Sequence, residues 1–235
     1  GFKASGNRDC DMALRSFTDI ITDTATLKGG MDAINARLIT PKIPDEIREI
    51  PSDRWLSTMT MCVFQAGFTW KVIENKWPNF ETAYDGFDIS RWSMMHDEDI
   101  DRLMATDGLV AHAPKIRSVG PNAHFLCQIE EDHGTVGAWF ADWQIADYCD
   151  NLRIVQKGGS RLGGKTGQMF LRRMGVDTLV FSNDVIKALG REGVVSKMPS
   201  SGKDFTSVQD AINQWHGETG RPLTQISQIL ALSVG

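Results

Sequence analysis

Residues 151–176 read NLRIVQKGGSRLGGKTGQMFLRRMGV, and the interpretation of the whole chain depends on this stretch. It contains six Lys or Arg residues and no Asp or Glu, although the chain carries a formal net charge of -5. Residues 158–166 form a glycine-rich turn, and residues 168–174 are predicted to form the helix that follows it. Backbone N–H groups left free at the start of a helix bind phosphate well. The stretch therefore predicts a phosphate-binding site on a local basic patch.

Three interpretations fit the glycine-rich turn. Residues 159–166 match the pattern G-x-x-x-x-G-K-S/T of a nucleotide-binding P-loop, and residues 178–184 resemble the strand and metal-binding Asp of such a site. The same turn fits the hairpin of a helix-hairpin-helix element, whose loop N–H groups hold one phosphate of the DNA backbone. It also fits a solvated turn between two helices. Because a P-loop follows a buried strand and only residues 152–155 precede this turn, the context favours the hairpin.

The composition is that of a globular protein. Hydrophobic residues make up 41% of the 235 residues and charged residues 23%, which allows one large domain or two small ones with a sizeable core. No apolar run is long enough to cross a bilayer and no signal peptide is recognised, so a cytoplasmic protein is expected. Residues 1–10 are expected to form a loose tail. The pI near 5.5 argues against a protein that coats DNA, but it is compatible with an enzyme that has one basic face.

The four cysteines, Cys10, Cys62, Cys127 and Cys149, are scattered, and no His stands near them at ligand spacing. Neither a disulfide framework nor a zinc site is predicted. Buried free thiols are the expected state for most of them.

Apolar residues recur at three- and four-residue intervals along most of the chain, which predicts an all-α fold of about ten helices. Two helices are expected in residues 11–39, with a break at Gly29 and Gly30. Residues 52–65 are apolar on nearly all sides, so this helix is expected at the centre of a domain. The shape of residues 124–150 is left open.

Three further expectations concern helix ends and charge. The helix of residues 71–77 is expected to stop at Pro78. The acidic segment 81–101 is expected to face solvent. Asp184 is expected to be the N-cap of a helix that starts at Val185, with a catalytic role as the alternative.

The most specific pattern begins at residues 64–70, FQAGFTW. Characteristic residues follow it in order and at fixed distances: Phe80, Phe87, Asp88, Gly108, Leu109, Val110, Lys115, Ile116, Asn122 and Ala123. Together with two helix-turn-helix units, this pattern resembles the DNA-3-methyladenine glycosylase I family of helix-hairpin-helix DNA repair enzymes. The resemblance covers residues 54–122 and 158–189, roughly half of the chain.

The resemblance implies an all-α, two-lobed fold with the base pocket in the cleft between the lobes. Residues from about 50 to 185 would form the central lobe with the hairpin motifs, and residues 11–49 with 186–235 the second. The family removes N3-methyladenine from double-stranded DNA by hydrolysing the N-glycosidic bond, so a monomeric DNA glycosylase of base excision repair is expected. A non-catalytic helix-hairpin-helix DNA-binding protein is the alternative, and a P-loop NTPase is the third possibility.

This chemistry needs few catalytic groups, and no catalytic residue is singled out. Methylation at N3 leaves the adenine positively charged and hence a good leaving group, so the protein mainly has to flip the base out, stack it and admit water. The resemblance implies that Trp70 stacks on the base, with a plain core tryptophan as the alternative. Cys62 and Gln65 would line the pocket. Phe68 or Gln65 would fill the gap left by the flipped nucleotide.

Backbone phosphates of DNA are expected to bind at two turns, through Arg161, Gly163, Gly164, Lys165, Thr166 and, near the turn at Gly108, Lys115. The wider superfamily implies at most a monovalent cation, held by carbonyl groups of the hairpin; no zinc or other cofactor is expected.

The chain also departs from the family. Members commonly carry a glutamate eight residues before the tryptophan, where this chain has Cys62, which cannot accept a charge-assisted hydrogen bond from an adenine amino group. The tyrosine-bearing motif before Trp55 and the zinc-binding Cys and His residues near both termini are missing. Ser182 stands where the wider superfamily often has a catalytic Asp. The resemblance thus implies a divergent, zinc-free branch whose base specificity is open.

Overall fold

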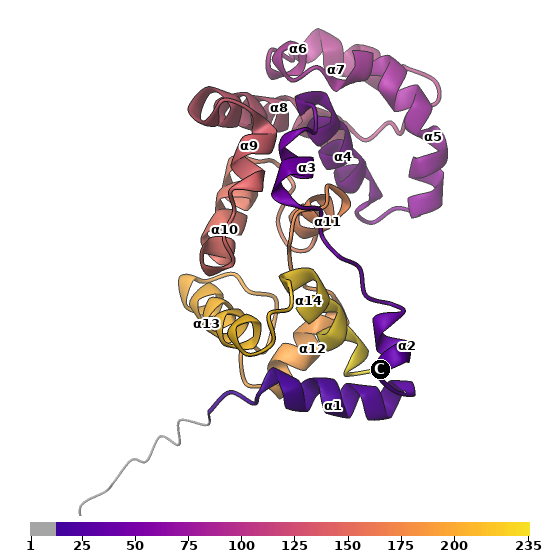
Figure 1. Ribbon diagram of the computed structural model, residues 1–235. Coiled ribbons are helices and arrows are strands. Elements are labelled where there is room, and N and C mark those ends of the chain that lie inside the picture. Colours follow the sequence, from indigo (N-terminus) through magenta and orange to yellow (C-terminus); the bar gives the residue numbers. More distant parts are fainter. Residues whose placement is uncertain (1–12) are drawn as a thin grey trace, which may run out of the picture.

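The computed structural model describes residues 13–235, and these residues form helices and turns without any strand (Figure 1). The expected all-α fold is confirmed. The expected tail of residues 1–10, and Cys10 with it, lies outside the described residues. The helices are α1 (Phe17–Lys28), α2 (Met31–Asn35), α3 (Pro44–Arg48), α4 (Ser52–Gln65), α5 (Trp70–Ala83), α6 (Ile89–Ser93), α7 (Asp97–Met104), α8 (Ala113–His133), α9 (Val136–Ala141), α10 (Tyr148–Gly158), α11 (Thr166–Arg173), α12 (Asn183–Arg191), α13 (Gly202–Thr219) and α14 (Leu223–Leu232). Within residues 13–235, no helix has the length and apolar character needed to cross a membrane.

The helix α4 lies at the centre of the larger group of helices, as its apolar sequence predicts. It contacts α5, α8 and α11. Trp55, Leu56 and Phe64 on this helix are fully buried, and the Trp55 ring stacks on Phe140 with 4.4 Å between the ring centroids. Burial of each such side chain contributes about 1.5–3 kcal/mol to folding. The position of α4 therefore fixes the turn that follows it at Gln65.

The helices fall into two groups that the chain joins by two crossing segments (Figure 1). The helices α3 to α9 pack around α4 and α8, whereas α1, α12, α13 and α14 pack on one another. The helix α11 packs on α4, and α10 contacts both α11 and α13. The chain crosses at residues 36–43 and 174–182. Because α3 packs on α9, the larger group includes Pro44, near the boundary at about residue 50 that the sequence suggests.

The two crossing segments lie side by side. The N–H of Lys42 donates to the carbonyl of Gly175 over 2.8 Å. Gly175 has a φ of 85°, and a Cβ atom there would lie 2.4 Å from the Lys42 side chain. Only glycine fits at this position without backbone strain and without a shift of the Lys42 side chain.

The second crossing segment contains the residues that could have formed the strand of a P-loop. It forms no strand, because side chains accept the hydrogen bonds of its backbone N–H groups. The N–H of Val180 donates to Ser227 Oγ over 3.0 Å, and that of Phe181 donates to Gln168 Oε1 over 2.7 Å. The carboxylate of Asp177 accepts hydrogen bonds from the first two N–H groups of α14. These contacts dock the segment onto α11 and α14 instead of onto a sheet.

The helix α5 continues through Pro78, so the expected stop at that residue is wrong. Proline removes one backbone donor from the helix. However, Trp77 and Phe80 are buried and stack with 4.7 Å between centroids, and Trp77 also stacks on Phe87 at 5.6 Å. The packing of these aromatic rings outweighs the lost hydrogen bond.

The N-cap of α12 is Ser182 and not the expected Asp184. Ser182 Oγ accepts the N–H of Val185 over 3.2 Å. Asp184 lies in the first turn of the helix, where a carboxylate still interacts favourably with the helix dipole. Residues 124–150, whose shape was open, form the end of α8, all of α9 and the start of α10.

Two acidic residues of the segment 81–101 do not face solvent as expected. Glu81 accepts hydrogen bonds from both terminal nitrogens of Arg54, at 2.7 and 2.9 Å. The Asp99 side chain is 6% exposed and accepts one from Arg91 over 2.6 Å. These two carboxylates join helices, while the other five acidic residues in the segment are exposed as expected.

Candidate functional site

A cavity of about 150 Å³ lies between the end of α4, the turn after it, the start of α5 and one face of α11. The three residues expected in the base pocket, Cys62, Gln65 and Trp70, line it together with Phe68, which was expected as a wedge. The remaining lining residues include two from the hairpin and two from later turns of α11: Lys165, Thr166, Met169 and Arg173. The fold thus brings the expected base pocket and the expected phosphate-binding turn to one place.

A tight turn directs Trp70 into this cavity. The helix α4 ends at Gln65, Gly67 adopts a φ of 77°, and the N–H of Phe68 donates to the Gln65 carbonyl over 3.1 Å. Trp70 then becomes the first residue of α5, with 47% of its surface exposed. A tryptophan that is this exposed can stack on a base with the ring face that the protein leaves uncovered.

Lys115 holds this turn in place from beneath. It is 4% exposed, and its Nζ donates to the carbonyls of Phe64 (3.2 Å) and Ala66 (2.5 Å) at the end of α4. The same Nζ lies 4.6 Å from the centroid of the Phe68 ring. Burial lowers the pKa of Lys115, and the nearby charge of Arg161 lowers it further. The prediction that Lys115 binds a DNA phosphate is wrong, because its ammonium group caps a buried helix end.

Gln65 does not serve as a wedge for the flipped nucleotide. Its side chain is 2% exposed, its Nε2 donates to the Trp70 carbonyl over 3.4 Å, and its Oε1 accepts from Arg173. Its place in the pocket wall agrees with the sequence, but the wedge role is wrong because the side chain is buried and occupied. Phe68, which is 40% exposed beside the pocket, has the access that a wedge needs.

Arg173 is the pocket residue that the sequence analysis missed. Its guanidinium lies 4.6 Å from the centroid of the Trp70 ring, and Nη1 donates to Gln65 Oε1 and lies 3.5 Å from Cys62 Sγ. Arg173 comes seven residues after Thr166 on α11, so the two residues share one helix face. That spacing was a usable signal once the helix had been predicted.

Cys62 brings no charge to the pocket. The residue is 4% exposed, and burial raises the pKa of its thiol to about 11, although Arg173 acts in the opposite direction. A neutral thiol and a guanidinium therefore stand where the family is expected to have a carboxylate.

The turn between α10 and α11 is a hairpin that leaves backbone donors free. Gly163, Gly164 and Lys165 are exposed, and in residues 13–235 no protein acceptor takes their N–H groups. Asn122 fixes the turn from α8, since its Oδ1 accepts the N–H of Ser160 (2.6 Å) and its Nδ2 donates to the Ser160 carbonyl (3.1 Å). The free donors lie directly before α11, a position in the chain that suits a phosphate.

Arg161 and Lys165 are exposed on this turn, and Arg161 adopts a φ of 61°, which is uncommon for a side chain other than glycine. Because a helix and not a strand precedes the turn, the P-loop interpretation is wrong.

The monovalent cation implied by the wider superfamily would need free carbonyl oxygens in the hairpin. The carbonyls of Leu162, Gly163 and Gly164 each accept one hydrogen bond. A carbonyl oxygen has two lone pairs, so each retains one. These carbonyls therefore keep an acceptor site each, and the binding of a cation there belongs to the proposals below.

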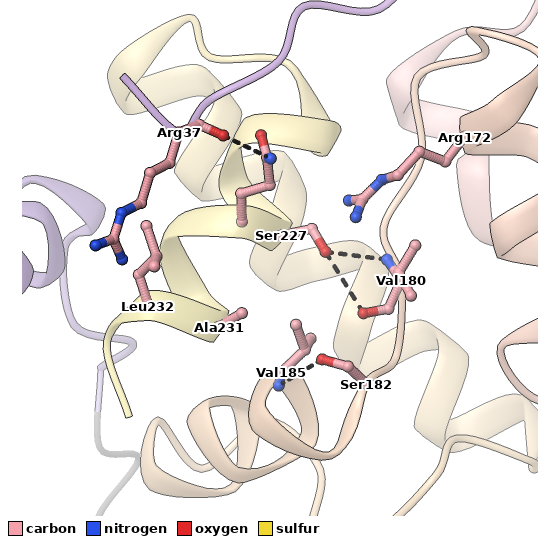
Figure 2. A pocket seen from close by; sticks show the side chains of 9 residues that line it. Arg37, Arg172, Val180, Ser182, Val185, Ser227, Ala231 and Leu232 are labelled. Carbon is pink, nitrogen blue, oxygen red and sulfur yellow. Dashed lines mark hydrogen bonds between the residues drawn. The ribbon is translucent and has the colours of Figure 1, made fainter. Parts of the chain in front are cut away.

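A second, larger cavity of about 230 Å³ lies where α12 and α14 meet the second crossing segment (Figure 2). Ser182 and Ser227 line it, but both hydroxyls already accept backbone N–H groups. Arg172 points into it, and its buried Nε and Nη2 find no acceptor among residues 13–235 (Figure 2). This cavity offers no aromatic face and no free acid or base, so the smaller cavity at Trp70 is the candidate site.

The arrangement of helices, hairpin and pocket defines the class: the fold is that of the helical DNA glycosylases. The 8-oxoguanine glycosylase/lyase of Methanocaldococcus jannaschii, solved with a 15mer DNA that contains 8-oxoguanine, superposes with a TM-score of 0.51 at 11% sequence identity. The similarity covers 91% of this chain and 95% of that one. A variant of 3-methyladenine DNA glycosylase I in complex with 3-methyladenine gives a TM-score of 0.50 at 18% identity, over 66% of this chain and 91% of that one.

The family likeness lies in the segment that holds the pocket. Residues 49–158 match the family model described as methyladenine glycosylase. DNA-3-methyladenine glycosylase 1 of Escherichia coli (strain K12) is 31% identical over 68 residues, which are 29% of this chain and 36% of that relative. The resemblance deduced from the sequence is thus confirmed for this segment, which ends where the glycine-rich turn begins.

Proposed function

We propose that this chain is a DNA glycosylase of base excision repair that hydrolyses the N-glycosidic bond of a damaged base flipped out of double-stranded DNA. The main support is that the pocket and the hairpin share α11: Lys165 and Thr166 stand at the hairpin and also line the pocket. A backbone phosphate held at this turn would therefore bring its neighbouring nucleotide to Trp70.

In this proposal each residue has a limited task. The flipped base stacks on Trp70, and Phe68 fills the space that the base leaves in the duplex. Water adds to C1′ of the sugar, the N-glycosidic bond breaks, and its electron pair leaves with the base. The N–H groups of Gly163, Gly164 and Lys165, with the Arg161 side chain, hold the DNA backbone so that the sugar stays beside the pocket.

Several finer points belong to the same proposal. N3-methyladenine is the base that the resemblance implies, because the named relatives are methyladenine glycosylases. We also propose that the protein acts as a monomer in the cytoplasm and that hairpin carbonyls hold a monovalent cation.

Release of free base from duplexes that each carry one damaged base would test the proposal. The panel should include N3-methyladenine and at least one neutral lesion. We expect release of at least one base, and a loss of about tenfold or more in Trp70→Ala, since stacking of a base on an aromatic ring contributes about 1–3 kcal/mol. DNA binding without release of any base would favour the alternative, a non-catalytic DNA-binding protein; this alternative gains some support from the absence of carboxylates among the residues that line the pocket.

A further inference from the structure

We propose that Arg173 makes the pocket selective for a neutral base with a carbonyl-bearing edge, of the 6-oxopurine type, and against a positively charged base. This inference rests on the proposed glycosylase function and narrows its substrate class. It departs from N3-methyladenine, the base that the resemblance implies.

The first step is that Arg173 has a defined place in the pocket. Three groups surround its guanidinium: Gln65 Oε1, Cys62 Sγ and the face of Trp70. Gln65 and Cys62 are themselves buried, at 2% and 4% exposure. A cavity of about 150 Å³ remains beside the guanidinium, and the partly exposed Phe68 and Trp70 line it. The edge of a base that stacks on Trp70 can therefore reach Arg173.

The second step concerns charge. The charged side chains that line the cavity are Lys165 and Arg173, and both are positive. Within the described part of the chain, Arg173 forms no ion pair with a carboxylate. Its charge repels a cationic base, and its guanidinium already makes a cation–π contact with one face of Trp70, so a cationic base on the other face gains less from the ring. Both effects act against N3-methyladenine before its release.

The third step concerns hydrogen bonds. A guanidinium carries five N–H donors, and the protein contacts described above use only Nη1. The O6 and N7 atoms of an oxopurine are both acceptors and match arginine in a bidentate way, whereas adenine presents an amino donor in place of O6. The donors of Arg173 thus suit an oxopurine edge.

The same contact assists bond cleavage. A neutral base is a poorer leaving group than an alkylated one, because the electron pair of the broken bond leaves it negatively charged. A guanidinium beside O6 and N7 stabilises that charge until the base takes the proton lost by the attacking water. Arg173 would therefore act on both binding and departure of the base.

The test compares single-turnover release of hypoxanthine and of N3-methyladenine from otherwise identical duplexes. We expect the parent protein to release hypoxanthine faster, and Arg173→Gln to lower the ratio of the two rates about tenfold or more. Arg172→Gln is the matched control, since the neighbouring arginine points into the other cavity (Figure 2). A parent protein that prefers N3-methyladenine, or a ratio that Arg173→Gln leaves unchanged, would overturn the inference.

A second experiment distinguishes a failure of the glycosylase proposal from a failure of the Arg173 inference. If no base is released, calorimetric binding of free hypoxanthine and free 3-methyladenine still tests Arg173. Tighter binding of hypoxanthine that is lost in Arg173→Gln and kept in Arg172→Gln would support the inference. Tighter binding of 3-methyladenine by the parent protein would contradict it.

Discussion

At the scale of single residues, the pocket differs from the family pattern through two side chains that act together. Cys62 removes the expected carboxylate, and Arg173 adds a guanidinium 3.5 Å from the thiol sulfur. The loss of the carboxylate or the added guanidinium alone would give the pocket a weaker charge preference than the two together. With both, the pocket has a positive charge where the family pattern has a negative one, and this motivates a test of neutral bases beside N3-methyladenine.

Lys115→Met should lower the free energy of unfolding by about 1–3 kcal/mol. The substitution leaves the carbonyls of Phe64 and Ala66 without their buried donor, and an unsatisfied buried acceptor costs about that much. Urea unfolding followed by circular dichroism would measure the change.

The salt dependence of DNA binding by folded Lys115→Met should match that of the parent protein, because the ammonium group does not reach the surface. Exposed Lys165, changed to Ala, provides the contrast. If Lys115→Met flattened the salt dependence and left stability unchanged, Lys115 would be a phosphate ligand after all.

At the scale of helices, Asp99 joins α7 to α6 and makes this contact sensitive to pH. The Arg91 guanidinium donates to both carboxylate oxygens and lowers the pKa of Asp99 to about 2, below its usual value near 3.8. The folded state therefore binds the proton less tightly than the unfolded state. The stabilisation is complete above about pH 4 and disappears as the pH falls toward 2.

Asp99→Asn should accordingly reduce stability by about 1–2 kcal/mol at pH 7, allowing for solvent screening. The difference from the parent protein should shrink as the pH falls from 4 to 2. Thermal unfolding at several pH values would measure it, with the exposed Asp101→Asn as control. A difference that stays constant down to pH 2 would rule out the ion pair as its source.

The hairpin depends on a helix from elsewhere in the chain. Asn122 on α8 replaces the missing backbone partners of Ser160, and Gly159 lies so close that a Cβ would meet Asn122 Oδ1 at 3.0 Å and Leu162 at 2.3 Å. The conformation of the turn is thus set by contact with α8 as well as by its own glycines.

Asn122→Ala should weaken DNA binding and reduce stability by about 1–3 kcal/mol, because both backbone groups of Ser160 lose their partner. Asn79→Ala is the control, since the side chain of Asn79 also donates a hydrogen bond to a turn carbonyl, that of Gly108, outside the hairpin. Amide hydrogen exchange would locate the effect, which should appear in residues 159–166. Equal effects of the two substitutions on DNA binding would argue against a special role of the hairpin.

At the scale of the whole molecule, an acidic chain presents a basic turn. The net charge of -5 opposes general attraction to DNA, so binding should depend strongly on a few contacts at the hairpin. The pocket is lined by α11, so the proposed sites for the base and for its backbone phosphate share one helix.

The double substitution Arg161→Ala, Lys165→Ala should weaken DNA binding and reduce the slope of log K against log salt by about 2 units, roughly 0.9 for each lost phosphate contact. Fluorescence anisotropy over a range of salt concentrations would measure the slope. Lys28→Ala, Lys187→Ala removes the same charge from α1 and α12 and should leave the slope nearly unchanged. Similar slopes for both double variants would show that net charge, and not the hairpin, controls binding.

The sequence by itself determined the all-α class, the break at Gly29 and Gly30, the buried α4 and the glycine-rich turn, which the structure limits to residues 159–165, because helix periodicity and glycine preferences act over a few residues. It also carried the family resemblance at residues 64–70. Only the tertiary structure decided that Lys115 points inward and that Arg173 enters the pocket. Gln65 and Arg173 are 108 residues apart, and their contact depends on which face of α11 packs against α4. Local preferences do not encode that choice, since it follows from the burial of the whole set of helices.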